Sequence, residues 1–474
     1  MSTDPNKESF IAWLPDLLYT GGRFERGLAL VCDAAGRIVK IAAAEELRDE
    51  KKVRLSNRAM LPGMINAHSH AFQRVLRGRT EFRGGQLPAS SGGSPTLNAA
   101  DSFWTWREMM YSAATRLTPE DIYDASRMAF LEMALSGITA VGEFHYLHHA
   151  PDGAPYDDPN LLAKEVVRAA NDVGLRIALL RVAYARSGYQ TEPNPKQQRF
   201  IERDPEIYLK NLERLIEDVG ASDAAWAGVA PHSVRAVPLD YLREVSAYAN
   251  EHQLKVHMHV AEQPAEVSAC VEEYGRTPIA LLDTEGLLSE RFTAVHAIHV
   301  TAKAIPALAR TGAIVCACPT TERNLGDGVV PADEYFKQGV AVCLGSDSHA
   351  QIDLLEDARA LEYHLRLQKL ERAVLGGAAL LFDCATVNGA RSIGASGGAL
   401  EAGKPADFFT VALDDPSIAG ASPEDLLSSI VFASTRAAVR EVVVGGKPIV
   451  SEGQHLIQDD VIERFNDLQK RLWS

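Results

Sequence analysis

The sequence predicts an α/β fold: a (β/α)8 TIM barrel with a smaller β-rich domain built from both ends of the chain. Two observations lead to this prediction. The middle of the chain alternates short apolar runs with amphipathic stretches of helical length, which is typical of parallel strands covered by helices. Both ends show short apolar runs broken by glycines such as Gly21, Gly22 and Gly36, and this pattern indicates strands.

Eight strand candidates follow one another in the middle section. Most are followed by polar residues, glycine or proline and then by a helical pattern, as in residues 118–136 and 353–370. Eight such units suit a closed barrel better than an open sheet. The expected strands are residues 59–67, 138–145, 176–184, 227–232, 254–260, 292–296, 313–318 and 340–345.

The barrel is expected to cover residues 61–399. Residues 1–60 and 400–474 are expected to combine in space into one β-sandwich-like satellite domain. Two stretches, residues 83–98 and 187–203, are rich in glycine, proline or polar residues and are expected to be long loops. Loops of this length often cover an active site, and disorder is the alternative.

The composition excludes several classes of protein. With 46% hydrophobic and 23% charged residues, the chain is typical of a globular protein. Its net charge of −15 would repel a polyanion, so nucleic acid is not an expected partner. The N-terminus lacks the layout of a secretion signal, and no apolar run approaches the ~20 residues of a membrane helix. We therefore expect a cytoplasmic protein that does not bind membranes.

The six cysteines are scattered, without a Cys-x-x-Cys pair, and we expect them to be reduced. Cys316 and Cys318 alternate in an apolar run, which favours buried packing over metal ligation.

A group of polar residues at the ends of distant strands carries the chemistry. His68 and His70 close the first expected strand and, two residues apart, face the same way. His259 closes the fifth strand, and Asp347 directly follows the eighth. A barrel brings the carboxyl ends of its strands together, and a buried aspartate is costly unless it is paired or binds a metal. The pattern therefore predicts a metal site made of three imidazoles and one carboxylate.

Two further residues stand next to this group. Glu262 lies three residues after His259, where its carboxylate can act as an acid or base, and His296 ends the sixth strand.

With these motifs the chain resembles the amidohydrolase superfamily over essentially its whole length. Within it, the chain is similar to the formimidoylglutamate deiminases, or N-formimino-L-glutamate iminohydrolases, of histidine degradation. The stretches that carry the resemblance are Leu-Pro-Gly at 61–63 with His-Ser-His-Ala-Phe-Gln-Arg at 68–74, Phe-Trp-Thr-Trp-Arg-Glu at 103–108, Glu-Phe-His-Tyr at 143–146, Pro-His-Ser-Val-Arg at 231–235 and Asn-Leu-Gly-Asp-Gly at 324–328. One departure is the loop at 83–98, which is longer than this family leads us to expect and precedes Arg107 directly.

The resemblance implies a role for each matching residue. His68, His70, His259 and Asp347 are implied as the metal ligands, with Glu262, His296 and Asp347 as catalytic residues. The implied substrate contacts are Gln73, Arg107, Tyr146, His232 and Arg235. Binuclear members of the superfamily bridge their metals with a carboxylated lysine on the fourth strand, and residues 229–233 contain no lysine. One divalent metal is therefore expected; zinc suits the ligand set best, with iron or manganese as alternatives.

Formimino-glutamate carries two carboxylates, and Arg107 and Arg235 can each clamp one through bidentate hydrogen bonds. The expected reaction is hydrolysis to N-formyl-L-glutamate and ammonia. In this hypothesis the metal lowers the pKa of a bound water from about 15.7 toward 7. Asp347 and His296 orient the hydroxide and help to accept its proton, while Glu262 protonates the formimino nitrogen and then the departing ammonia.

Two other functions stay open at this point. The same metal site could deaminate a heterocyclic base such as guanine or a pterin, which would need stacking and amide donors rather than two guanidiniums. A binding protein that has lost its chemistry is the other alternative, but such a protein normally lacks some of the ligands. Barrel amidohydrolases commonly form dimers, so a homodimer that binds a small dicarboxylate is expected.

Overall fold

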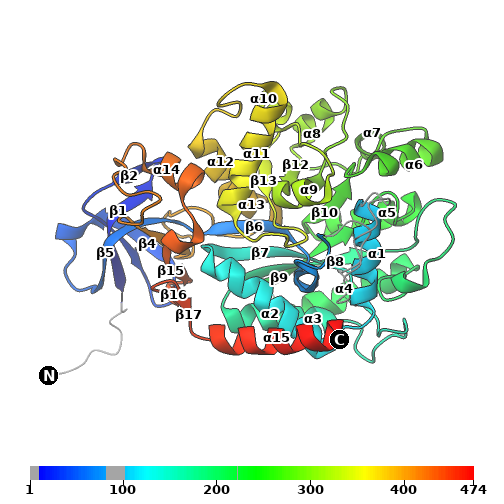
Figure 1. Ribbon diagram of the computed structural model, residues 1–474, viewed down its shortest axis with the longest axis horizontal. Helices are drawn as coiled ribbons and strands as arrows, with labels where there is room; N and C mark the ends of the chain where they lie inside the picture. The colour runs from blue at the N-terminus through cyan, green and yellow to red at the C-terminus, as the bar shows by residue number, and fades with distance from the viewer. Residues whose placement is uncertain (1–9, 82–101, 221) are drawn as a thin grey trace, which may run out of the picture.

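Eight parallel strands form the core of the molecule, as the sequence predicts. The structure, a computed structural model, describes residues 10–81, 102–220 and 222–474. Each barrel strand pairs with the next one in the chain, and a parallel bridge between Ser69 and Asp347 joins the last strand to the first (Figure 1). The strands are β6 (Met64–Ser69), β7 (Ile138–His145), β8 (Arg176–Ala183), β9 (Ala225–Pro231), β10 (Val256–Val260), β11 (Phe292–His296), β12 (Ile314–Ala317) and β13 (Val342–Leu344).

The first expected strand, residues 59–67, differs from the structure. Residues 59–62 complete β5 (Lys51–Pro62), which belongs to another sheet, and β6 starts after Gly63. Both halves of the run are apolar and buried, so the sequence shows no boundary. A Cβ at position 63 would lie 2.3 Å from the hydroxyl of Thr139, which explains why a glycine stands where the chain changes sheets.

Helices surround the barrel strands, and the two helices expected at 118–136 and 353–370 are present. The first begins at a capping box in which Thr118 and Asp121 satisfy each other's backbone N–H groups. The helices are α1 (Phe103–Ala114), α2 (Pro119–Leu135), α3 (Leu161–Val173), α4 (Pro205–Val219), α5 (Leu239–Glu251), α6 (Pro264–Tyr274), α7 (Pro278–Thr284), α8 (Ile305–Thr311), α9 (Pro319–Leu325), α10 (Ala332–Lys337), α11 (Leu354–Lys369), α12 (Ala378–Ala385) and α13 (Val387–Ile393).

The two ends of the chain meet in a second sheet of nine strands at one end of the barrel (Figure 1). Its strand order is β17-β16-β15-β14-β5-β1-β3-β4, with β2 paired to β1, so all nine strands form one connected sheet. The antiparallel pairing of β5 with β14 joins the N-terminal and C-terminal parts. The remaining strands are β1 (Ile11–Thr20), β2 (Arg23–Glu25), β3 (Leu28–Cys32), β4 (Ile38–Ala43), β14 (Phe408–Ala412), β15 (Val439–Val444), β16 (Lys447–Ser451) and β17 (Gln454–His455).

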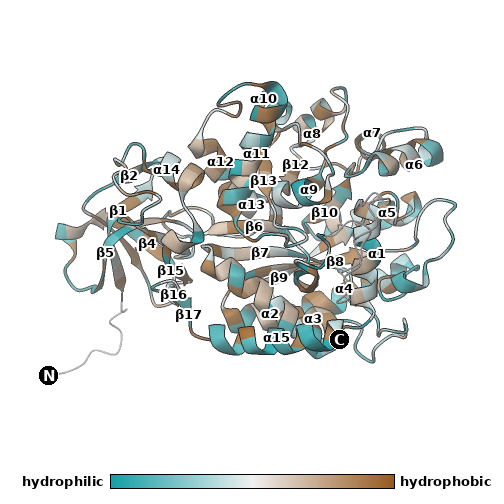
Figure 2. Ribbon diagram, viewed as in Figure 1, coloured by the Kyte–Doolittle hydropathy of each residue, from teal (hydrophilic) through white to brown (hydrophobic). Residues whose placement is uncertain are grey.

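Two helices near the C-terminus leave this sheet. α14 (Leu426–Ala433) packs against α11 and α12, and α15 (Gln458–Trp473) lies along α2 of the barrel. Figure 2 shows that α15 carries both hydrophilic and hydrophobic residues, as an amphipathic helix does. Such a helix can cover the barrel with its hydrophobic face. From the sequence, residues 400–474 as a whole are assigned to the terminal domain, because the apolar runs at both ends of the chain indicate strands.

Two other expectations concern segments between these elements. Residues 187–203 contain only a short 3-10 helix, η3 (Pro195–Gln197), so the expected long loop is present. The loop expected at 83–98 lies outside the described residues. All six cysteines are buried and unpaired, and Cys316 and Cys318 pack in an apolar cluster as expected. Among the described residues, no helix is long and apolar enough to span a membrane.

A buried ion pair ties the barrel to the terminal sheet. Nε and Nη2 of Arg176, at the start of β8, donate to the carboxylate of Asp407 at 2.6 and 3.1 Å. We expect Arg176→Ala to lower the free energy of unfolding by about 3–5 kcal/mol, because Asp407 would stay buried without its partner. Urea unfolding measures the loss. Arg23→Ala is the control, since Arg23 and Glu25 form an exposed pair, and its loss should cost below about 1 kcal/mol.

Candidate active site

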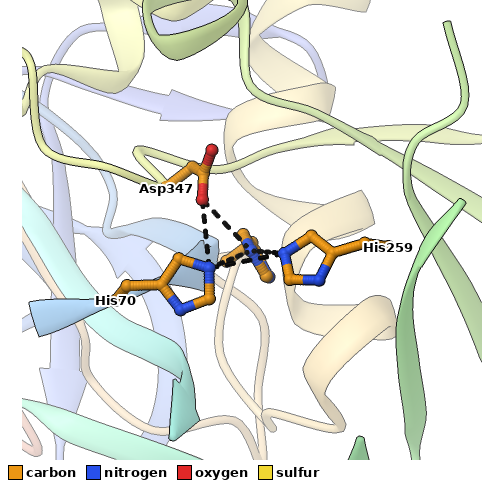
Figure 3. A group of neighbouring side chains, drawn as sticks. His70, His259 and Asp347 are labelled. Atoms are coloured by element: carbon orange, nitrogen blue, oxygen red, sulfur yellow. Dashed lines mark hydrogen bonds and ion pairs between the residues drawn. The ribbon is translucent and has the colours of Figure 1, made fainter. Parts of the chain in front are cut away.

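Four side chains from three distant strands converge at the carboxyl end of the barrel (Figure 3). His68 and His70 come from the end of β6, His259 from β10, and Asp347 from the loop after β13; all four are buried. The Nε2 atoms of the three histidines lie 3.2, 3.2 and 3.3 Å from one another. Oδ1 of Asp347 lies 3.4 Å from Nε2 of His68 and 3.2 Å from that of His70.

These separations fit one metal ion. A tetrahedral zinc ion with bonds of about 2.0–2.1 Å holds its ligand atoms roughly 3.3–3.4 Å apart. Five of the six distances in the group lie within 0.2 Å of that range, and the sixth, between His259 and Asp347, stays within 4.8 Å. The three histidines and the aspartate that the sequence predicts as ligands are thus brought together.

The ligand side chains are held in the protonation state that a metal needs. Nδ1 of His70 donates to the carbonyl of Phe144 at 2.9 Å, and Nδ1 of His259 donates to that of His232 at 3.1 Å, so both Nε2 lone pairs face the group. Burial lowers the pKa of His68 to about 3. Burial alone would raise the pKa of Asp347, but its contacts with His68 and His70 outweigh burial and hold that pKa well below its usual value. Neutral imidazoles therefore face an ionised carboxylate.

The backbone near Asp347 fixes the carboxylate next to the histidines. Its N–H donates to the carbonyl of His68 at 3.0 Å, and its carbonyl accepts the N–H of His70 at 3.1 Å. Asp347 has φ 45°, in the left-handed region, which is strained for a residue other than glycine. A Cβ at Gly345 would lie 2.7 Å from that of His68, so the strand can approach the ligand only with glycine there.

A chain of buried hydrogen bonds supports the four candidate metal ligands. Ser69 donates to Glu143 at 2.5 Å and contacts Nε2 of His349 at 3.1 Å, and Nδ1 of His349 contacts Ser346 at 3.1 Å. Glu143 also accepts the N–H of Ala71 at 2.7 Å. His349 thus belongs to the network that supports the ligands. Glu143, part of the Glu-Phe-His-Tyr stretch at 143–146, therefore holds Ser69 and Ala71, the residues on either side of His70.

Glu262 and His296 lie beside the ligand group. Nε2 of His296 is 3.6 Å from the Glu262 carboxylate and 3.9 Å from that of Asp347, while its Nδ1 contacts Glu322 at 3.3 Å. Burial raises the pKa of Glu262 to about 7, although His296 opposes this shift. Burial alone would lower the pKa of His296, but Glu262, Glu322 and Asp347 outweigh it and raise the pKa to about 10. Glu262 can thus both give and take a proton near neutral pH.

A cavity opens next to these residues. Every residue that the sequence names as a substrate contact lines it: Gln73, Arg107, Tyr146, His232 and Arg235. Glu262, His296 and Asp347 line the same cavity together with His70 and His259. The structure therefore gathers three of the four expected ligands, the acid/base residues and the substrate contacts around one space.

Arg107 reaches this cavity from α1. Its guanidinium lies 4.3 Å from the ring centre of Trp104, and its Nε and Nη1 atoms are buried with no hydrogen-bond partner among the described residues. Burial, with a contribution from the charge of Arg235, lowers the pKa of Arg107. Arg235 donates from Nη1 to the carbonyl of Ser187 at 2.8 Å. Two guanidinium groups thus share one cavity, and the first has unused donors.

Sequence reasoning missed several residues of the cavity wall. Tyr111 stands four residues after Arg107 on α1, so helical spacing would have placed both on one face. Tyr184 directly follows β8, at the strand end where sites of this barrel form. Trp106 also lines the cavity, whereas Trp104 is exposed and its ring lies against the guanidinium group of Arg107.

Comparison with known proteins agrees with this geometry. The family model described as "Amidohydrolase family" matches residues 59–449. The chain belongs to the amidohydrolase family. A formimidoylglutamate deiminase from Pseudomonas aeruginosa is 38% identical over 405 residues, which cover 84% of this chain and 86% of that protein. A 5-methylthioadenosine/S-adenosylhomocysteine deaminase from Haloarcula marismortui is 27% identical, covering 96% and 95% of the two chains.

Solved structures share the fold of this amidohydrolase. The crystal structure of an amidohydrolase from Brucella melitensis superposes with a TM-score of 0.86 at 32% identity, covering 98% of this chain and all of that one. An adenosine deaminase from Xanthomonas campestris with bound zinc reaches a TM-score of 0.80 at 22% identity, covering 98% of both chains. The chain is a metal-dependent hydrolase of the deaminase and deiminase type, acting on a carbon–nitrogen bond.

Proposed function

We propose that this amidohydrolase hydrolyses N-formimino-L-glutamate to N-formyl-L-glutamate and ammonia, a reaction of histidine degradation. The formimino C=NH group takes up one water, becomes the formyl C=O group and releases ammonia. The observation that carries the proposal is the pair of guanidinium groups, Arg107 and Arg235, in the cavity beside the ligand group. A substrate with two carboxylates supplies the partners that the buried Nε and Nη1 of Arg107 lack. The 38% identical Pseudomonas enzyme supports the same substrate.

One divalent metal ion, zinc in our proposal, would be held by His68, His70, His259 and Asp347. Three neutral imidazoles and one carboxylate at tetrahedral spacing suit zinc, and iron or manganese are the alternatives. When bound there, such an ion lowers the pKa of water toward 7 and so provides a nucleophile at neutral pH. β9 ends in Val229-Ala230-Pro231 and carries no lysine to bridge a second ion, which supports a single metal.

The side chains around the cavity suggest how the reaction proceeds. The lowered pKa of Asp347 keeps its carboxylate ionised at the cavity, and in our proposal this carboxylate accepts a proton from the attacking water. His296 has a raised pKa and therefore orients that water as a donor through Nε2, which has no other hydrogen-bond partner among the described residues. Glu262, with a pKa of about 7, protonates the formimino nitrogen, regains the proton that Asp347 took from the water and passes it to the departing ammonia. As the C–N bond breaks, the new hydroxyl group becomes the formyl C=O and its proton restores Glu262.

Gln73 and Tyr146 would contact the middle of the substrate. Nε2 of Gln73 donates to the hydroxyl of Tyr146 at 2.7 Å, and Oε1 of Gln73 is a buried acceptor without a partner among the described residues. That acceptor suits an N–H of the substrate. His232 packs between Tyr184 and His259, with ring centres 4.6 and 4.9 Å away, and its ring forms the adjacent wall.

Deamination of a heterocyclic base, such as guanine or a pterin, is the second candidate. It is favoured by the relatives named as deaminases of 5-methylthioadenosine and S-adenosylhomocysteine, which are 27–29% identical to this chain. A flat base would stack on aromatic rings and leave both guanidinium groups without carboxylate partners. We therefore rank this activity second.

An ammonia-release assay on the purified protein tests the proposal. N-formimino-L-glutamate, guanine, a pterin and 5-methylthioadenosine are compared at equal concentrations, and metals in the same preparation are counted by elemental analysis. We expect turnover of N-formimino-L-glutamate with one metal ion per chain. If ammonia is released only from a ring compound, that compound replaces N-formimino-L-glutamate as the proposed substrate. If the purified protein binds no metal, the proposed metal-dependent hydrolysis is wrong.

The two arginines give a direct prediction about substrate binding. We expect Arg107→Ala and Arg235→Ala each to lower kcat/KM for N-formimino-L-glutamate by about 10- to 100-fold, because a hydrogen bond to a charged group contributes about 1.5–3 kcal/mol. The metal content should not change, since neither residue is a ligand. Arg116→Ala, just beyond the end of α1, is the matched control and should retain full activity. Undiminished activity of both cavity variants would instead favour a ring substrate.

A further inference from the structure

Two tyrosine hydroxyls stand next to the arginines in the cavity wall. Tyr111 lies one helical turn after Arg107 on α1, and Tyr184 follows the end of β8. Both line the cavity, and both side chains are almost fully buried, at 2% and 1% exposure. The ring of Tyr184 also contacts His232, with the ring centres 4.6 Å apart. Neither hydroxyl has a role in the function described so far.

Gln197 joins the two hydroxyls. It lies in the loop of residues 187–203, is buried to 1% exposure, and places Nε2 2.7 Å from the hydroxyl of Tyr111 and 2.7 Å from that of Tyr184. The other end of its amide lies 2.5 Å from Oγ of Ser187. That distance is normal for O–H···O but too short for N–H···O, so the amide oxygen faces Ser187 and the NH2 group faces the tyrosines.

The hydrogen bonds of this cluster leave a donor unused. Both N–H groups of Gln197 donate, so the hydroxyls of Tyr111 and Tyr184 each act as an acceptor. Each hydroxyl still has one hydrogen of its own. The two hydroxyls are also hydrogen-bonded to each other, and Arg235 is hydrogen-bonded to Tyr184. Because arginine only donates, one hydroxyl hydrogen remains, and no hydrogen bond in the described part of the chain gives it an acceptor. Burial raises the pKa of Tyr111, so its phenol stays protonated as a donor.

The same loop holds both arginines. Ser187, which donates to Gln197, also accepts Nη1 of Arg235 through its carbonyl at 2.8 Å. Tyr111 connects Gln197 to the helix that carries Arg107, and Nη1 of Arg199 in this loop donates to the carbonyl of Leu117, just beyond that helix, at 2.8 Å. The loop at 187–203 therefore contacts Arg235 directly and the helix of Arg107 through Tyr111.

We propose that Tyr111 and Tyr184 are specificity residues that donate hydrogen bonds to a carboxylate of the substrate beside Arg107 and Arg235, and that Gln197 is the positioning residue that turns both hydroxyls toward it. The inference rests on the proposed function, because it takes an N-substituted amino dicarboxylate as the ligand. Phenol hydroxyls and guanidinium groups together surround a carboxylate with donors and no acceptor. This arrangement selects an anionic end group over a neutral amide or a ring.

Kinetics and direct binding test the proposal. Tyr111→Phe, Tyr184→Phe and Gln197→Met are each expected to raise KM for N-formimino-L-glutamate by about tenfold or more, with kcat within about threefold of the parent enzyme. Calorimetry with the product N-formyl-L-glutamate should show the same loss of affinity. Tyr189→Phe and Gln198→Met change the same residue types in this loop, at a partly buried and an exposed position that do not line the cavity; they are the matched controls and should bind normally.

Two truncated ligands separate a donor role from a merely structural one. N-formyl-4-aminobutyrate lacks the α-carboxylate, and N-formyl-L-norvaline lacks the side-chain carboxylate. The loss of affinity caused by each Tyr→Phe substitution should vanish for one of these two ligands. The carboxylate that this ligand lacks is the one that the tyrosines contact. An equal loss of affinity for N-formyl-L-glutamate and both truncated ligands, or no loss for any of them, would overturn the tyrosine assignment. The proposed function would then still stand. A parent enzyme that releases no ammonia from N-formimino-L-glutamate would overturn both.

Discussion

Glu262→Gln is expected to lower kcat for ammonia release by about 10²- to 10⁴-fold while the metal content stays unchanged. Glutamine keeps the size and hydrogen-bonding reach of the side chain but cannot give or take a proton at this pH. The loss should be large because the burial that raises the pKa of Glu262 to about 7 makes it fit for transfer in both directions. Its carboxylate is also 3.6 Å from Nε2 of His296 at the cavity, where the departing nitrogen must be protonated.

A matched control for this prediction lies one helical turn further along. Glu266 is also buried, and its Oε2 accepts the N–H of Glu262 at 3.2 Å, but it does not line the cavity. Glu266→Gln keeps an oxygen for that hydrogen bond, so its kcat should remain within about tenfold of the parent enzyme. Unchanged turnover in Glu262→Gln, measured together with elemental analysis, would refute the acid/base role. Loss of the metal in this variant would show that Glu262 acts through the ligands instead.

His259→Gln is expected to remove both the metal and the activity, with kcat/KM lowered by more than about 10³-fold. Nε2 of His259 lies 3.2 and 3.3 Å from those of His68 and His70, and an amide at this position is a much weaker metal ligand. The same variant should lose the stabilisation that zinc gives the parent enzyme, about 4 kcal/mol at a zinc concentration 1,000 times the Kd. Elemental analysis and thermal melting with and without zinc measure these effects.

His257→Gln is the control on the same strand. His257 is equally buried in β10, but its Nε2 contacts the carbonyl of Ser392 at 3.2 Å rather than the ligand group. The His257→Gln variant should therefore keep the metal, the activity and the zinc-dependent rise in melting temperature. If chelation leaves the melting temperature and activity of the parent enzyme unchanged, the four side chains do not bind a catalytic metal.

The candidate site shows how far sequence reasoning reaches when a fold is regular. His68, His70, His259 and Asp347 are far apart in the chain, yet each stands at the carboxyl end of a recognisable apolar strand, and a barrel places those ends together. The ends of individual strands were harder to predict. The apolar run at 59–67 contains the end of one sheet and the start of another, and only the backbone packing around Gly63 separates them.

The loops illustrate the other limit. The sequence indicates that residues 187–203 form a long loop, but nothing in their order shows that Gln197 would reach both Tyr111 and Tyr184. Such contacts depend on where α1 packs against the loop, which is settled by the shape of the whole barrel. The supporting role of Glu143 beneath Ser69 escaped notice for the same reason, because it joins neighbouring strands through their side chains.

The sequence by itself determined the kind of protein: the strand rhythm, the ligand residue types and the two arginines, because these follow from local periodicity and from chemistry that each residue carries alone. The tertiary structure alone decided the distances of 3.2–3.4 Å among the ligand atoms and the raised pKa values of Glu262 and His296. It also decided the link from Gln197 to the cavity wall. Those properties arise from burial and from contacts between residues distant in the chain, which no local pattern contains.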